Sequence, residues 1–254
     1  MTGRIEVIPL PGLPEVRPGT SLGRAIAEAA SRAGVALRDD GVVVVSQKVV
    51  SKAEGRVRDL REVEPGTRAR GLARQLGKDP RLVQVVLDES ERLVRAERGV
   101  LIAQTRQGWV CANAGVDASN VPGEGRVALL PHDADASARR IRAEIAALTG
   151  ARPAIVVADS FGRPWRLGQA DVAIGCAGLA PLDDWRGRLD REGRELAATA
   201  VAVADEVAAA ADLARDKASG TPACLIRGLE RLVTGDDGPG AAALRRPAGE
   251  DLFR

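Results

Sequence analysis

The chain is poor in the residues from which many catalytic and structural sites are built. Its 254 residues include no tyrosine, two phenylalanines, three tryptophans and a single histidine, His132. The three cysteines, Cys111, Cys176 and Cys224, stand far apart without a Cys-x-x-Cys pair. This spacing indicates neither a disulfide framework nor a zinc site, and it fits a reducing compartment. A Ser-His-Asp triad or a metal centre with several histidines would depend on His132 alone, so both classes are set aside.

Charge is abundant but nearly balanced, and lysine is scarce. The chain has 37 basic and 35 acidic residues, a net charge of +2, and only four lysines: Lys48, Lys52, Lys78 and Lys217. Such a balance points to neither a nucleic acid nor a membrane surface as partner. The N-terminus has no apolar stretch long enough for a signal peptide or a membrane span, so we expect a cytoplasmic protein.

Hydrophobic patterns predict an α+β protein with many short strands and unevenly distributed helices. Expected strands cover residues 4–10, 42–45, 81–87, 100–105, 109–112, 127–130, 153–158 and 223–226, and expected helices cover residues 22–33, 65–77, 135–148 and 195–217. A tight turn is expected at residues 106–108, an exposed excursion at 181–193 and a loose tail from 235 to 240. No proline- or serine-rich linker and no internal repeat divides the chain. We therefore expect residues 1–254 to form one domain of two interlocked subdomains, with mixed and antiparallel sheets and a boundary that the sequence does not define.

The most informative stretch is DSFGRPWRLGQADVAIGCAG, residues 159–178, which follows the apolar run 153–158. Asp159 and Ser160 are expected at the carboxyl end of that strand, where layered α/β folds keep their chemistry. Residues 161–164 are expected to turn, because their glycine permits unusual dihedral angles and their proline restricts the preceding residue. Asp159 and Ser160 offer oxygen ligands for Mg²⁺ or Mn²⁺. On composition alone, a surface loop whose aspartate caps a turn explains the stretch equally well.

Two further segments leave predicted strands. Residues 46–52 (SQKVVSK) form an expected loop with two of the four lysines, which are phosphate ligands or solvated strand ends; the residues alone favour solvated ends. In residues 113–120 (NAGVDASN), Asp117 and Asn120 are candidate metal and nucleotide contacts, or simply turn-forming residues. Neither GxxxxGK[ST] nor GxGxxG occurs, so a nucleotide would need a different cradle. Two carboxylates from separate loops suit Mg²⁺, so the residues indicate an enzyme that handles metal and phosphate.

Four long stretches, in order, resemble the coenzyme F420-0:γ-glutamyl ligase family. They are VVVVSQKVVSKAEGR (42–56), AGVDASNVP (114–122), DSFGRPWRLGQADVAIGCAGL (159–179) and VAVADEVAAAADL (201–213), with GLPEVRPG (12–19) before them and DLFR at the end. Each stretch alone is a weak signal, but their shared order is specific and spans essentially the whole chain.

The resemblance implies a GTP-dependent ligase that forms intertwined homodimers with a two-part α+β fold. Its substrates would be coenzyme F420-0, GTP and L-glutamate. GTP and a divalent metal, Mg²⁺ or Mn²⁺, would activate the lactyl carboxylate of coenzyme F420-0 as an acyl phosphate, with K⁺ as a further candidate cofactor. L-Glutamate would then form the amide, and further glutamates would join through γ-linkages.

Family matching also assigns candidate roles residue by residue. Nucleotide contacts are matched to Leu13, Pro14, Glu15, Val16, Ser46, Gln47, Lys52 and Asn120, with Lys52 at the phosphates. Metal ligands are matched to Asp117, Asp159 and Ser160, and the catalytic set comprises Lys52, Asp117 and Asp159. Some relatives carry serine in place of Gln47, and the segment around Lys217 is not matched residue by residue.

Two other functions are compatible with the same residues. One is a nucleotide-dependent carboxylate–amine ligase with a different acceptor acid, in which the same side chains would keep their roles. The other is a nucleotide-binding protein without turnover, which the presence of both metal-binding acids and Lys52 disfavours.

Overall fold

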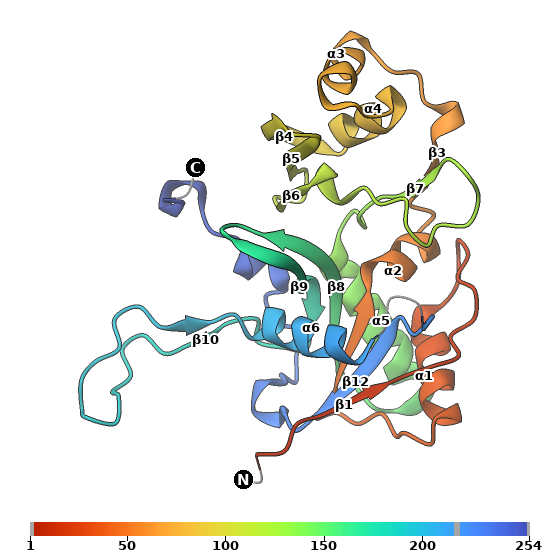
Figure 1. Ribbon diagram of the computed structural model, residues 1–254. Helices are drawn as coiled ribbons and strands as arrows, with labels where there is room; N and C mark the ends of the chain where they lie inside the picture. The colour runs from red at the N-terminus through yellow and green to blue at the C-terminus, as the bar shows by residue number, and fades with distance from the viewer. Residues whose placement is uncertain (1–2, 216–218, 253–254) are drawn as a thin grey trace.

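The protein is built on a five-stranded mixed sheet, seen in a computed structural model that describes residues 3–215 and 219–252. The strand order is β1 (Glu6–Pro9), β12 (Ala223–Arg227), β2 (Val42–Ser46), β8 (Ala154–Arg163) and β9 (Arg166–Ala177) (Figure 1). Strands β2 and β8 are parallel, whereas the other neighbours in this sheet are antiparallel. The predicted α+β class with mixed and antiparallel sheets is confirmed.

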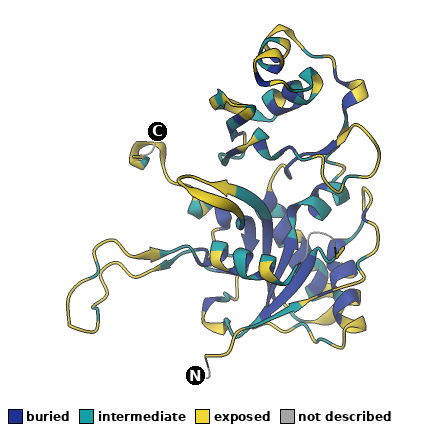
Figure 2. Ribbon diagram, viewed as in Figure 1, coloured by how far each residue is buried: buried dark blue, intermediate teal, exposed yellow. Residues whose placement is uncertain are grey.

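Helices cover both faces of this sheet, which is why its central strands are continuous apolar runs. On one face, α1 (Leu22–Arg32) and α5 (Ala134–Thr149) pack against Val43 and Val45 of β2. On the other face, α6 (Val203–Ala214) packs against Val42 and Val44. Because strand side chains alternate between faces, the four valines supply two to each layer. The central strands of the sheet are buried between these helices, as Figure 2 shows.

A smaller group of elements has its own hydrophobic cluster. Helices α3 (Thr67–Leu76) and α4 (Pro80–Asp88) lie beside a sheet of β4 (Ser90–Glu97), β5 (Val100–Thr105) and β6 (Val110–Ala112) (Figure 1). The antiparallel pair β3 (Val57–Asp59) and β7 (Arg126–Ala128) lies between this group and the main sheet. The remaining elements are α2 (Gln47–Ala53), β10 (Asp183–Asp184), β11 (Ala200–Val201) and 3₁₀ turns at Leu60–Glu62, Asn113–Gly115, Glu230–Leu232, Ala241–Leu244 and Ala248–Glu250. The division into subdomains and the homodimer stay predictions.

Local signals predicted several elements well. Ser21 caps α1 by accepting a hydrogen bond from the Arg24 backbone N–H, and Gly150 ends α5 in a left-handed conformation. The expected turn at residues 106–108 joins β5 to β6, with Gly108 at φ +90°. The excursion that begins at Pro181 is exposed (Figure 2). Among the described residues, no helix is long and apolar enough to cross a membrane.

Two segments expected to be strand or loop are helices. Residues 81–87 lie in α4, because Asp79 caps the Arg81 backbone N–H, Pro80 occupies the first turn, and Val83 and Val86 are buried in the hydrophobic cluster of the smaller group of elements. The local β-propensity of these residues is weaker than the combined effect of capping and packing. The prediction of a loop at residues 46–52 is also wrong. Ser46 is the last residue of β2, and residues 47–52 belong to α2.

Three boundaries also differ from expectation. Strand β8 continues to Arg163, and the chain turns at residues 164 and 165 instead of 161–164. Because a proline favours an extended conformation in the residue before it, Pro164 is compatible with a strand that reaches Arg163. Helix α6 begins at Val203, because β11 pairs with β10 instead of extending the helix. The expected loose tail is followed at once by buried Ala241, whose backbone N–H donates to Asp135.

A buried arginine ties α5 to the C-terminal segment. Arg142 is 1% exposed. Its guanidinium donates to the carbonyl oxygens of Pro153, Thr234 and Asp236 at 3.2, 2.9 and 2.8 Å and pairs with the Asp237 carboxylate at 2.8 Å. Removing it would leave several carbonyl oxygens without a donor, so these contacts stabilise the fold.

We expect Arg142→Met to lower the free energy of unfolding by about 3 kcal/mol, the scale of breaking one partner of a buried pair. Arg139→Met is the matched control on the same helix, because Arg139 is partly exposed and its ion pair with Asp133 spans 3.8 Å. It should change the stability by less than about 0.5 kcal/mol. Urea unfolding followed by circular dichroism would measure both, and equal effects would contradict this role of Arg142.

Candidate active site

A cavity lies where the parallel pairing of β2 and β8 ends. The last aligned pair is Ser46 and Ala158, so the start of α2 and the part of β8 from Asp159 onward meet at one edge of this pairing. The cavity has a volume of about 910 Å³. Its walls also include Leu13 to Val16, the loop around Asp117, and the segment from Gly220 to Pro222.

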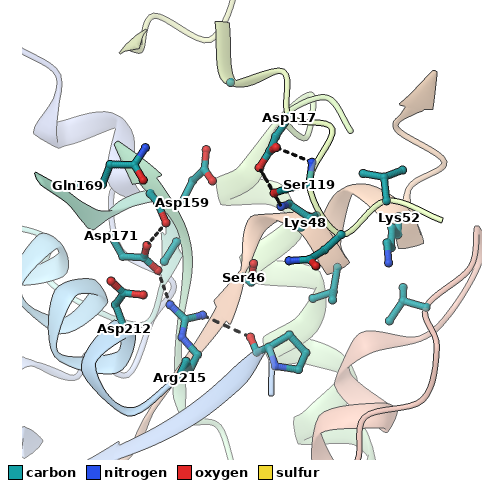
Figure 3. Close-up of a pocket in the computed structure, with 18 of the residues that line it drawn as sticks. Ser46, Lys48, Lys52, Asp117, Ser119, Asp159, Gln169, Asp171, Asp212 and Arg215 are labelled. Carbon is teal, nitrogen blue, oxygen red and sulfur yellow. Dashed lines mark hydrogen bonds and ion pairs between the residues drawn. The ribbon is translucent and has the colours of Figure 1, made fainter. Parts of the chain in front are cut away.

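Helix α2 directs two lysines into this cavity. Lys48 and Lys52 are one helical turn apart, and their side chains are only 17% and 13% exposed. Lys48 Nζ contacts Asp117 Oδ2 at 2.8 Å and Ser119 Oγ at 2.7 Å (Figure 3). Lys52 Nζ contacts Glu15 Oε1 at 3.1 Å. Neither lysine is a solvated strand end, because both are held by side chains of the cavity wall.

Asp117 is fixed by the loop that follows β6. Its backbone pairs with Ala128, and its Oδ1 accepts a hydrogen bond from the Ser119 N–H at 2.7 Å. The loop leaves β6 through Asn113 and Ala114, both at positive φ, which is uncommon for residues other than glycine. Burial raises the pKa of Asp117, but hydrogen bonds from Lys48 and Ser119 outweigh it, so the net pKa lies below the usual range. Asp117 is therefore a carboxylate at neutral pH.

Asp159 has the opposite electrostatic environment. Its pKa is raised to about 7, mainly by burial and also by the neighbouring Asp171 and Asp117, while the Ser160 backbone N–H and Lys48 oppose the shift. Figure 3 shows Asp159 between Asp171 and Asp117. Among the described residues, no basic side chain forms an ion pair with it. A bound cation would relieve this repulsion and restore the carboxylate.

The donor set fits a metal that shares its coordination with substrate and water. Within residues 3–215 and 219–252, no group of three or more His, Cys, Asp or Glu side chains forms a ready-made metal cage. Mg²⁺ needs only one or two protein carboxylates when phosphates and waters complete its shell. Asp117, Asp159 and Ser160 all line the cavity and offer oxygen atoms. These three residues would hold the ion.

A second charged cluster lies on the opposite wall. Ser160 Oγ donates to Asp171 Oδ1 at 2.6 Å, and Arg215 pairs with Asp171 Oδ2 (Figure 3). The Asp171 and Arg215 side chains are 6% and 7% exposed. Gln169 and Asp212 line the cavity nearby.

The structure brings most of the predicted site residues to one cavity. Its lining contains Leu13, Pro14, Glu15, Val16, Ser46, Lys52, Asn120, Asp117, Asp159 and Ser160. Gln47 is different: its side chain is buried and donates to Ser51 Oγ at 2.8 Å and to the Leu129 carbonyl at 3.0 Å. Lys217 lies outside the described residues.

Sequence reasoning did not assign Lys48, Asp171 or Arg215 to the site. The scarcity of lysine was a usable signal for Lys48, which lies four residues before Lys52. Asp171 faces Ser160 across the β8–β9 ladder, a register that follows only from the true position of the turn. Arg215 had no comparable signal, because its partner Asp171 is 44 residues away in the chain.

The raised pKa of Asp159 predicts a pH-dependent effect of Asp159→Asn on stability. The unfolded carboxyl titrates near ~3.9, so the folded state binds its proton more tightly, and this contribution is lost as the pH rises through 7. Asparagine resembles the protonated form. In EDTA, Asp159→Asn should therefore raise the melting temperature relative to wild type more at pH 8.5 than at pH 5.5. Calorimetry would measure the difference, and Glu206→Gln, an exposed change on α6, should show no such trend.

Comparison with known proteins identifies the family. The family model described as F420-0:Gamma-glutamyl ligase matches residues 12–228. The chain is 41% identical over 251 residues to the coenzyme F420:L-glutamate ligase of Methanothermobacter thermautotrophicus, covering 98% of this chain and 99% of that protein. It is 44% identical over 255 residues to the protein of the same name from Methanopyrus kandleri, covering 100% and 98% of the two chains. For the Haloarcula marismortui protein of that name, identity is 42% over 257 residues, with coverage of 98% and 96%. The chain therefore belongs to the F420-0:gamma-glutamyl ligase family.

Proposed function

We propose that the protein is a ligase that joins L-glutamate to coenzyme F420-0 at the expense of GTP, and then adds further γ-linked glutamates. The observation that carries this proposal is identity of 41–44% to coenzyme F420:L-glutamate ligases over essentially the whole chain. The cavity supports it, because acids and lysines converge where the parallel pairing of β2 and β8 ends. Its volume of about 910 Å³ suits several substrates held together.

The proposed reaction has two steps. The lactyl carboxylate oxygen of coenzyme F420-0 attacks the γ-phosphorus of GTP, forming an acyl phosphate and releasing GDP. The amine of L-glutamate then attacks the acyl carbon, and the carbon–oxygen bond to phosphate breaks. This step forms the amide and releases phosphate and a proton. The first step brings an anion to a polyanion, so its transition state depends on positive charge arranged in advance.

The chain's own residues would supply that charge and hold the substrates. Leu13, Pro14, Glu15, Val16 and Asn120 would contact the nucleotide, together with Ser46. Lys52 would lie at the phosphates, and Lys48, one turn away, would add a second cation beside Asp117. A tight nucleotide contact to Lys52 would replace its exposed partner Glu15. Gln47 would act indirectly, by holding α2 against Leu129.

Asp117, Asp159 and Ser160 would hold Mg²⁺ or Mn²⁺. When bound, such an ion supplies positive charge to the phosphate oxygens. The two acids differ in how their negative charge is stabilised before the ion binds. Lys48 and Ser119 hold Asp117 as a carboxylate, whereas Asp159 lies among other acids. No residue is assigned to K⁺, which stays a candidate cofactor.

A direct assay tests the function. Purified protein with coenzyme F420-0, GTP, Mn²⁺ and L-glutamate should release GDP and phosphate and form a product heavier by one or more glutamyl residues, detected by mass spectrometry. GDP release only with another acceptor acid would assign a related carboxylate–amine ligase instead. GTP binding without GDP release under full substrate would indicate a nucleotide-binding protein without turnover.

We expect Asp117→Asn and Asp159→Asn each to abolish turnover while the protein stays folded. An amide lacks the negative charge that would hold the metal, and neither side chain fills a hydrophobic core. Steady-state rates at increasing Mg²⁺ would measure this, and high metal should partly rescue weak variants. A variant with the wild-type rate at saturating Mg²⁺ would exclude that residue as a metal ligand.

Lys52→Ala should lower kcat/KM for GTP by roughly a hundredfold, about 3 kcal/mol, the scale of one charge-assisted transition-state contact. Lys78→Ala is the matched control, because Lys78 follows α3 and does not line the cavity. It should be nearly silent. Kinetics at one salt concentration, with circular dichroism to confirm folding, would compare them, and equally small effects would refute the phosphate role.

A further inference from the structure

Asp171 and Arg215, which lie beside Ser160, have no role in the chemistry described so far. Ser160 and Asp171 are direct partners across the β8–β9 ladder, and their side chains meet at 2.6 Å. Asp171 is almost fully buried, so its charge needs a partner, which Arg215 provides from the end of α6. We propose that Asp171 is a positioning residue that orients the Ser160 hydroxyl for a divalent cation, and that Arg215 holds Asp171 in place.

The hydrogen of the Ser160 hydroxyl is donated to Asp171. A serine hydroxyl has one hydrogen to donate and two lone pairs to offer. Asp171 Oδ1 accepts that hydrogen, so it cannot point toward a cation, and the lone pairs stay available to the cavity that Ser160 lines. Hydrogen bonding to a carboxylate also makes the oxygen a better ligand. This step rests on the proposed function, because it takes Ser160 as a metal ligand.

Asp171 is itself held in place by Arg215. Arg215 bridges Asp171 Oδ2 and the Pro222 carbonyl, the latter at 3.4 Å. The same carbonyl accepts the Ser46 backbone N–H at 2.8 Å. A continuous chain of contacts therefore runs from Ser160 on β8 through Asp171 on β9 and Arg215 to Pro222, the residue before β12, and on to the end of β2. Figure 3 shows its central part, the pair of Asp171 and Arg215. This chain of contacts joins the strands that border the cavity.

This arrangement differs from a simple stabilising ion pair. Arg215 Nε is buried without a hydrogen-bond partner among the described residues, so the pair is not arranged for maximal stability. Replacing a buried ion pair by neutral groups is often harmless to stability. The presence of both charges beside the hydroxyl of Ser160 fits a role in positioning.

The test measures metal-dependent nucleotide binding without relying on turnover. Binding of the fluorescent nucleotide mant-GDP is followed by anisotropy while Mn²⁺ is titrated, for wild type, Ser160→Ala, Asp171→Asn and the double variant. Each single variant should raise the Mn²⁺ concentration for half-maximal binding by about tenfold or more, the usual effect of losing a ligand's orienting partner. The double variant should match Ser160→Ala alone, because Asp171 acts through Ser160.

Controls separate positioning from stability. Asp183→Asn removes an ion-paired, poorly exposed acid outside the cavity, and it should leave the Mn²⁺ requirement unchanged. If Asp171→Asn does not fold, Asp171→Asn with Arg215→Gln removes both charges and serves in its place. That double variant should regain stability but not Mn²⁺ affinity, whereas a merely structural ion pair predicts recovery of both.

Three results would overturn the inference. Asp171→Asn could bind Mn²⁺ within twofold of wild type, or the effects of Ser160→Ala and Asp171→Asn could multiply, which would make the residues independent. In either case wild type still binds nucleotide with Mn²⁺, so the proposed function is unaffected. Failure of wild type itself to show Mn²⁺-dependent binding would overturn both. Mn²⁺-dependent binding with the expected variant pattern but no ligase product would refute the proposed activity alone.

Discussion

The parallel pairing of β2 with β8 is the constraint on which the site depends. Both strands are buried on two faces, and their register aligns Val45 with Val157 and Ser46 with Ala158. Beyond Ser46 the chain leaves the sheet as α2 with its lysines, whereas β8 continues through Asp159 at the same edge. Parallel neighbours must be joined by a long crossover, and the crossover from β2 to β8 contains the loop that carries Asp117.

Charge compensation differs among Asp117, Asp159 and Asp171, three of the acids that line the cavity. Asp117 has Lys48, and Asp171 has Arg215, both in close ion pairs. Within the described residues, Asp159 has no such partner, and the two neighbouring carboxylates add to its repulsion. Of these three acids, Asp117 and Asp171 are paired on opposite walls, and Asp159 lies between them (Figure 3). Positive charge from a ligand is electrostatically most favourable beside Asp159.

Sequence patterns predicted the elements that depend on neighbours in the chain. Helices α1 and α5 have capping side chains and terminal glycines within a few residues, and the valine run of β2 is apolar on both faces. Sequence patterns predicted elements less well where contacts between distant segments decide the secondary structure. Residues 81–87 have strand propensity but are helical, since burying Val83 and Val86 in the hydrophobic cluster beside α3 and β5 outweighs a weak local preference. The start of α6 likewise depends on β10, which is distant in sequence.

The site divides in the same way. The sequence by itself determined the family motifs and hence the candidate acids Asp117 and Asp159, the hydroxyl of Ser160 and the lysine Lys52, because each stands in a recognisable stretch. Only the tertiary structure decided the ion pairs around these residues. Lys48 pairs with Asp117 across 69 residues, and Arg215 pairs with Asp171, the partner of Ser160, across 44. The tertiary structure also placed Gln47 in the core, away from the cavity. The physical reason is range: capping, turns and strand alternation act over a few residues, whereas ion pairs and desolvation depend on which distant segments the folded sheet brings together.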